Sequence, residues 1–304
     1  MRCFMLATTV QMARGRIGLL PFFVLAVCVL SCASTRAELY ELDLHLHALS
    51  GTGSDMFDSS GAPISEATPG GALLPVVSAA QKTRPSGTTW DFTGTASGSN
   101  LWVLPKSKEN GILFLGIGAE EIATADLAGP ITFAFQGLSG TAGGVFSMWD
   151  VDSFGNPQPL ITSASGFGLP NALTIAAGGH SHFNYGFTAP GLYEVTFRAT
   201  ANLAASLGGG EVSGIGTFKF GVFDTVSTYP EPDPMVGPYA FFGTNFGNYI
   251  YGDGHVDLGM ALVPVPEPSS MALAALGVAG VLAAGYRRRR RAAGPKSTAT
   301  EIAG

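Results

Sequence analysis

Cysteine is nearly absent from this chain of 304 residues, and its three copies, Cys3, Cys28 and Cys32, all precede residue 38. The remainder of the chain therefore forms no disulfide and no thiolate metal site. A domain built from it depends on a packed core, a bound ion or both for its stability.

Basic residues are also scarce away from the two ends of the chain. Between Glu38 and Pro268 there are 21 acidic and 6 basic residues, a balance of −15 that the overall charge of −6 conceals. Nucleic-acid binding uses lysine and arginine at the phosphates, so we expect no nucleic-acid partner. The composition suits an extracellular surface or one that binds cations.

Motifs of the common enzyme classes are missing as well. The chain has no Gly-x-Ser-x-Gly elbow, phosphate-binding loop, His-Glu-x-x-His helix or dinucleotide fingerprint. Glu120 and Glu121 are adjacent, so on a strand they face opposite sides and do not act as one carboxylate pair. We therefore predict that the protein is not an enzyme.

The N-terminus has the composition of an export signal. Basic residues precede an apolar run over residues 17–30, and small residues suit cleavage after Ala37. Residues 1–37 are therefore predicted to be a signal peptide. The alternatives are an uncleaved membrane anchor, for which the run is short, and a lipidated Cys32.

The C-terminus carries a proline–acid motif, an apolar stretch over residues 271–286 and an arginine cluster, in that order. The residues of the first and third parts are Pro266, Glu267, Pro268, Arg287, Arg288, Arg289, Arg290 and Arg291. The stretch is rich in alanine, leucine, valine and glycine, which predicts a transmembrane helix slightly short of a full span. The arginines should stay cytoplasmic, followed by a cytoplasmic tail over residues 292–304.

This order closely resembles the PEP-CTERM sorting signal over residues 265–291. The resemblance implies that an exosortase recognises the helix in the inner membrane and cuts near the Pro-Glu-Pro motif. The anchored precursor would then be released to the outer surface or the extracellular polysaccharide of a Gram-negative-type bacterium. Residues 38–264 are the predicted surface domain.

Residues 38–264 have the pattern of an all-β unit, because short alternating runs are bounded by glycine, proline, asparagine and serine. Tyr193 follows a turn and enters an alternating strand, where immunoglobulin-like domains place a tyrosine corner. We predict a single immunoglobulin-like β-sandwich, with loops over residues 50–88 and 224–253. The predicted strands are residues 39–48, 101–104, 112–116, 131–136, 145–149, 172–176, 180–187, 192–199, 216–223 and 255–262.

All five histidines stand two positions from another ligand-type residue, and residues i and i+2 of a strand face the same side. Adjoining strands would bring nitrogen and carboxylate ligands together, as zinc prefers, although imidazole also binds copper and nickel. We predict a transition-metal site, with zinc as the first choice, made of His45, His47, His180, His182, Asp43, His255 and Asp257. The alternative is a structural or adhesive matrix protein that binds polysaccharide or protein without metal.

Longer strings in the central region support the metal hypothesis. They are DLHLH at 43–47, LWVLP at 101–105, GILFLGIGAEEI at 111–122, DSFGNP at 152–157, HSHFNYGFTAPG at 180–191 and HVDLG at 255–259. Together they resemble the choice-of-anchor M domain of surface-anchored proteins. That resemblance implies extracytoplasmic metal capture beside a metal ABC transporter system. The HVDLG segment usually precedes DLHLH closely, and here it lies far downstream, which leaves the roles of His255 and Asp257 open.

Overall fold

The structure, a computed structural model, describes residues 39–49, 55–224, 240–241, 244–245, 247–251 and 253–265. The predicted signal peptide and the apolar stretch of residues 271–286 lie outside these ranges. Within them, no helix combines the length and the apolar composition needed to span a bilayer.

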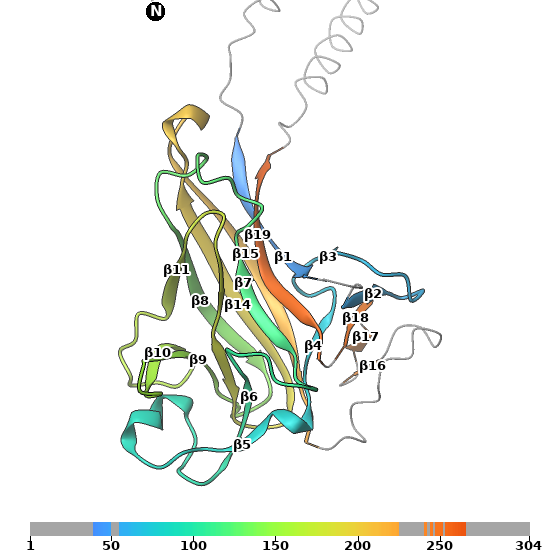
Figure 1. The fold of residues 1–304 in the computed structure, drawn as a ribbon, viewed down its shortest axis with the longest axis vertical. Helices are drawn as coiled ribbons and strands as arrows, with labels where there is room; N and C mark the ends of the chain where they lie inside the picture. Colours follow the sequence, from blue (N-terminus) through green and yellow to red (C-terminus); the bar gives the residue numbers. More distant parts are fainter. Residues whose placement is uncertain are drawn as a thin grey trace, which may run out of the picture. The chain divides into compact units, whose positions relative to one another are not determined.

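The described residues are mostly β-sheet, as predicted, with short 3-10 helices between some strands (Figure 1). The helices are η1 (Ser78–Ala80), η2 (Thr88–Thr93) and η3 (Ala205–Leu207). The strands are β1 (Tyr40–Ala48), β2 (Met56–Asp58), β3 (Glu66–Ala67), β4 (Leu73–Val76), β5 (Gln81–Thr83), β6 (Asn100–Leu104), β7 (Phe114–Gly118), β8 (Ile131–Gly140), β9 (Phe146–Val151), β10 (Pro157–Thr162), β11 (Ala172–Ile175), β12 (His180–His182), β13 (Asn184–Phe187), β14 (Gly191–Asn202), β15 (Glu211–Val222), β16 (Ala240–Phe241), β17 (Thr244–Asn245), β18 (Asn248–Ile250) and β19 (His255–Pro264).

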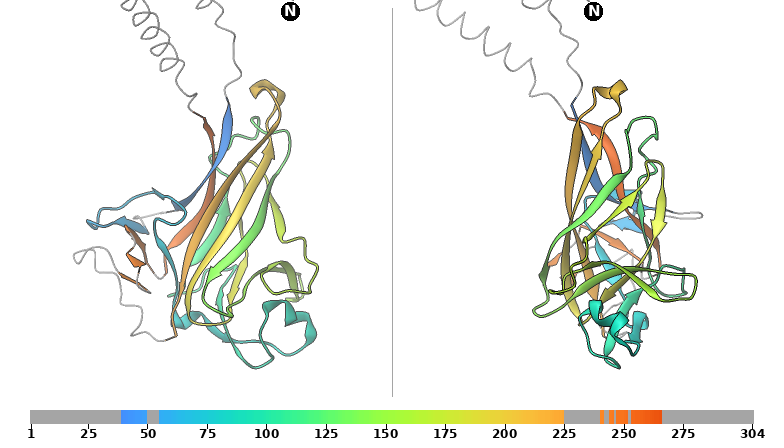
Figure 2. Two further views of the ribbon diagram at one scale, coloured as in Figure 1. Left: turned by 180° about the vertical axis from the view of Figure 1, so that it is seen from behind. Right: turned by 90° about the vertical axis from the view of Figure 1, so that its left-hand side faces the viewer.

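Most of these strands form three five-stranded sheets. The first sheet has the order β12-β7-β19-β1-β3, the second β10-β9-β13-β6-β5 and the third β11-β8-β14-β15-β4. Figure 2 shows the long strands β8, β14 and β15 running beside one another. Pairing is mainly antiparallel, but β19 runs parallel to β7 and β15 runs parallel to β4.

One hydrophobic core joins all three sheets, and the alternation along the strands explains which residues enter it. Along β14 every second residue from Tyr193 to Ala201 is buried, and Leu42, Leu44 and Leu46 of β1 enter the same core. The two faces of a strand alternate, so the polar residues between them point away from the core. This leaves Asp43, His45 and His47 on the opposite face of the first sheet.

Tyr193 makes the backbone contacts of a tyrosine corner. Its hydroxyl donates to the Ala189 carbonyl at 2.9 Å and accepts from the Ala189 amide at 3.0 Å. Tyr193→Phe should therefore lower the free energy of unfolding by about 1–2 kcal/mol, since the partly buried amide and carbonyl of Ala189 lose their partner. Urea denaturation measures this. Tyr251→Phe is the control, and an equal loss in both variants would contradict the assignment.

The structure corrects the predicted boundaries in several places. Residues 50–88 were predicted as loop, yet β2, β3, β4 and β5 lie there, and Leu73–Val76 is buried beside β15. The prediction missed β10 because its prolines interrupt the strand pattern. Proline is tolerated in β10 because this strand lies at the edge of the second sheet. The strand predicted at residues 180–187 is divided, with β12 in the first sheet and β13 in the second.

Candidate metal centre

All five histidines lie on one face of the first sheet. His180 pairs with Gly118 and His182 pairs with Gly116, which joins β12 to β7. Gly116 in turn pairs with Asp257 of β19, and Asp257 pairs with His47 of β1. Directly paired residues of neighbouring strands project to the same side of a sheet. The histidine pairs predicted to share a face within each strand therefore also share it between strands.

The same pairing places the two remaining histidines. His255 of β19 pairs with Phe114 of β7, and His45 of β1 pairs with Gly259 of β19. The reverse face of these strands carries the apolar residues Leu115, Ile117, Val256 and Leu258, which belong to the core. The first sheet thus has one apolar face and one face lined with imidazole and carboxylate.

Glycines of β7 and β19 make room for these polar side chains. A Cβ at Gly116 would overlap Asp257 Oδ1 and would lie 2.6 Å from His180 Nε2. A Cβ at Gly118 would lie 2.8 Å from carboxylate oxygens of both Asp257 and Glu120. The central strands therefore form a depression that a larger residue would fill.

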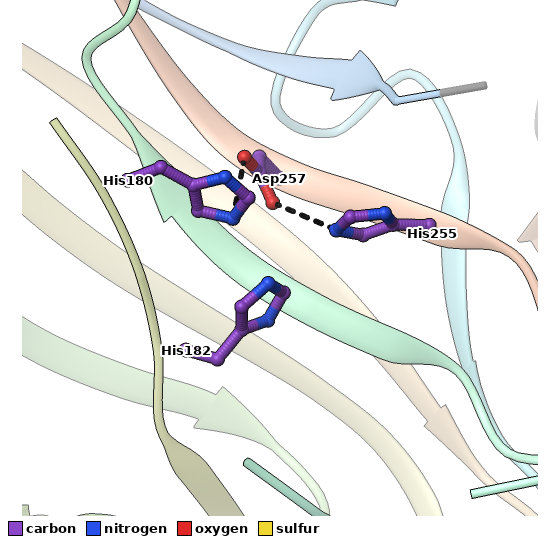
Figure 3. A group of neighbouring side chains, drawn as sticks. All are labelled: His180, His182, His255 and Asp257. Carbon is purple, nitrogen blue, oxygen red and sulfur yellow. Dashed lines mark ion pairs between the residues drawn. The ribbon is translucent and has the colours of Figure 1, made fainter. Parts of the chain in front are cut away.

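Four of the predicted ligands meet in this depression and are named the His3Asp site. His180, His182, His255 and Asp257 each offer one ligand atom, and these atoms lie within 4.8 Å of one another. Figure 3 shows the three imidazoles arranged around the Asp257 carboxylate. β12 and β19, separated in the sheet by β7, supply all four residues.

A carbonyl and a carboxylate contact the outer ring nitrogens of two of the imidazoles. His182 Nδ1 lies 3.0 Å from the Leu115 carbonyl, and since a carbonyl only accepts, Nδ1 carries the proton. His180 Nδ1 lies 3.1 Å from Glu120 Oε1. A histidine that donates one ring N–H to a carbonyl leaves the other nitrogen free to bind metal. His182 therefore has the tautomer that leaves Nε2 free to bind metal.

The atoms that face the centre lack ordinary hydrogen bonds. Among the described residues, His180 Nε2, His255 Nε2 and both Asp257 oxygens are buried without a partner of hydrogen-bond geometry. His180 Nε2 lies 3.2 Å from Asp257 Oδ2, and His255 Nε2 lies 4.0 Å from Asp257 Oδ1. Two ligands about 2.1 Å from a tetrahedral zinc ion are about 3.4 Å apart, so the spacing suits such an ion.

Burial changes the protonation of these groups. It raises the pKa of the fully buried Asp257 to about 7, and the neighbouring Glu120 carboxylate adds to the rise. Burial lowers the pKa of His182 to about 4, despite the bond to Leu115, and lowers the pKa of His255. His182 and His255 are therefore neutral near pH 7, which is the form that binds metal.

Phe114 supports the imidazoles from one side. Its ring stacks on His182 with centroids 3.7 Å apart and an interplanar angle of 11°, and its centroid lies 4.7 Å from that of His255. Such packing restricts the rotamers of the ligands before any ion binds. Phe114 therefore contributes to the preorganisation of the site.

The remaining histidines form a separate group with a glutamate, named the His2Glu site. His45 Nε2 and His47 Nδ1 each lie 3.2 Å from Glu121 Oε1. The sequence pattern predicted one centre for all five histidines, whereas the structure divides them between two groups on one sheet face. Asp43 belongs to neither group: its side chain is mostly exposed, and its Oδ2 lies 3.8 Å from His45 Nδ1.

The predicted ligand set did not include the two glutamates. Glu120 and Glu121 follow β7 in a turn, and their side chains diverge, so that Glu120 contacts His180 and Glu121 contacts His45 and His47. Their divergence agrees with the expectation that they do not form one carboxylate pair. The signal available in the sequence was the pair of glycines spaced by two, Gly116 and Gly118. On a strand they leave room on one face for polar side chains such as Asp257, His180 and Glu120.

Comparison with known proteins identifies the C-terminal segment. Residues 264–291 match the PEP-CTERM protein-sorting motif, which agrees with the predicted range of residues 265–291. The motif indicates an exported, membrane-sorted protein of a Gram-negative bacterium and implies processing by an exosortase. No curated protein and no solved structure matches the chain.

Proposed function

We propose that this protein is a surface protein whose β-rich domain binds zinc through the His3Asp site. The observation that carries the proposal is the convergence of buried, hydrogen-bond-deficient atoms from His180, His255 and Asp257. Burial of such atoms is costly unless a partner is present, and a cation satisfies all of them at once. His182 completes a set of four ligands.

The donor set favours zinc over the hard cations. Three imidazoles and one carboxylate suit zinc or another late transition metal, whereas calcium and magnesium take oxygen ligands. Four protein ligands also correspond to a closed, structural or storage-type zinc site, since catalytic zinc keeps a position for water. This agrees with the expectation of a protein that is not an enzyme.

The sorting motif supports the cellular context of this proposal. We propose that an exosortase cuts the precursor near Pro266 and that the domain then reaches the outer surface or the extracellular matrix. The contacts of Tyr193 support an immunoglobulin-like sandwich, and the histidine-lined face supports the choice-of-anchor M resemblance. An acidic exterior with a zinc site is suited to extracytoplasmic metal capture for a metal ABC transporter system.

Glycine substitution tests the proposed function without removing a ligand. In the purified full chain, Gly116→Ala should weaken zinc binding at the His3Asp site roughly 10–100-fold, because the new methyl group displaces Asp257 and His180. Competition against a chromophoric chelator measures the affinity. Gly137→Ala is the matched control, since a Cβ there meets nothing within 4 Å.

Two results would contradict the proposal. Equal zinc affinity in the two glycine variants would show that zinc does not occupy the depression over Gly116. Absence of zinc binding by the unaltered chain, with thermal stability indifferent to chelator, would favour the alternative of an adhesive matrix protein.

A further inference from the structure

The His2Glu site has the geometry of a second metal site. His45 Nε2, His47 Nδ1 and Glu121 Oε1 lie within 4.8 Å of one another, and both nitrogens lie 3.2 Å from the same oxygen. A tetrahedral zinc ion places its ligands about 3.4 Å apart, which is close to both of these distances. One carboxylate oxygen in contact with two imidazoles is thus arranged as one face of a coordination tetrahedron.

A second observation is the space reserved for His45. Its side chain is only 6% exposed, and its ring lies over Gly259, where a Cβ would approach Nε2 to 2.6 Å. Its other nitrogen, Nδ1, is buried without a hydrogen-bond partner among the described residues. The Asp43 carboxylate lies 3.8 Å from that nitrogen.

We propose that His45, His47 and Glu121 form a second divalent-metal site, distinct from the His3Asp site, which holds zinc or a similar ion. The inference uses its own ligands and goes beyond the proposed function of the His3Asp site.

The number of ligands distinguishes the two sites. Three protein ligands leave a fourth position for water or an external ligand, as in zinc sites that exchange ligands. The second site should therefore bind its ion more weakly and more exchangeably than the His3Asp site, which has four ligands.

The two sites are linked by adjacent residues of one turn. Glu120 contacts His180 of the His3Asp site, and Glu121 contacts both histidines of the second site. β19 also serves both, since Asp257 belongs to the first site and Gly259 underlies His45. Two ions would therefore be held side by side on one sheet face.

Metal counting on the full chain tests the second site. The chelator-treated protein is equilibrated with a small excess of zinc and then separated from the free ion. Mass spectrometry of the metal then gives the number of bound zinc ions per chain. We expect two ions per unaltered chain. Glu121→Gln should leave one, because the neutral amide binds zinc poorly, and Gly259→Ala should weaken the second site at least about 10-fold. Glu109→Gln, which changes an exposed ion pair with Lys82, is the matched control and should leave two.

Asp257→Asn separates this inference from the proposed function. This variant should also retain one ion per chain. The retained ion is the weakly held one of the second site, which Glu121→Gln removes. One ion per unaltered chain that persists in Glu121→Gln would overturn the second site and leave the first intact. Two ions that persist in Glu121→Gln would also overturn it, and no bound ion at all would overturn both proposals.

Discussion

Saturating zinc should raise the free energy of unfolding of the chelator-treated protein by about 4 kcal/mol at a thousandfold excess over the dissociation constant. The ion binds only the folded state, because β12 and β19 bring the His3Asp ligands together from distant parts of the chain. His182→Ala should remove most of this gain. The loss of one of four ligands opens the site, and the stacking of the imidazole on Phe114 is lost with it.

Urea denaturation with and without zinc measures this effect. The experiment is performed in the Glu121→Gln background, so that only the His3Asp site is loaded. Each variant is compared with its own metal-free form, which separates loss of the ion from loss of packing. Magnesium, which prefers oxygen ligands, is the control cation and should not stabilise the protein. Full zinc stabilisation of the His182→Ala variant would contradict the assigned ligand set.

Asp257→Asn should stabilise the metal-free protein near pH 8 and raise its free energy of unfolding by on the order of 2–4 kcal/mol. Asp257 is fully buried beside Glu120, and its pKa is raised from 3.8 to about 7. Above pH 7 the folded protein therefore holds a buried negative charge without a hydrogen-bond partner among the described residues, and asparagine removes that charge. The same substitution should abolish zinc binding at the His3Asp site, since it removes the anionic ligand.

The sign of the pH dependence follows from the raised pKa. Between pH 4 and 7 the folded state keeps a proton that the unfolded state has released. The stability that Asp257 contributes is therefore fully present below about pH 4 and is lost as the pH rises through 7. The advantage of Asp257→Asn should accordingly be small at pH 4 and largest at pH 8.

His182 opposes this trend in the unaltered protein. Its pKa is lowered from 6.5 to about 4, so its contribution is lost as the pH falls through 4. The difference between the unaltered protein and Asp257→Asn isolates the aspartate, provided that chelator is present throughout. Asp253→Asn, at an exposed position, is the control and should show no such difference. An Asp257→Asn variant less stable than the unaltered protein at pH 8 would contradict the expectation.

These expectations describe a proposed site that favours binding over stability. In metal-free protein the buried Asp257 carboxylate would destabilise the fold, and a bound cation would compensate for that cost. The acidic balance of the domain would add a long-range attraction for cations. Under the proposed function, a domain without cysteine would bind metal through sheet geometry and not through thiolates.

The local sequence pattern was sufficient to predict several of the strands, the direction of their side chains and the sorting motif. The alternation of apolar and polar residues predicted β1 and β14 closely. It also predicted that Asp43, His45 and His47 face away from the leucines of β1, which are Leu42, Leu44 and Leu46. Side-chain direction in a strand repeats every two residues, so it is a local property that sequence alone specifies. The sorting motif is similarly local, because order and composition over residues 264–291 define it.

The sequence by itself therefore determined the β-rich class, the sorting motif and the face on which each histidine pair lies. Only the tertiary structure decided that β19 lies between β7 and β1, and that this arrangement divides the histidines between two sites. The tertiary structure also places Glu120 and Glu121, which lie in a turn, in contact with these histidines. Pairing between distant strands depends on the packing of the whole core, and turn residues carry no periodic signal, so neither follows from local pattern.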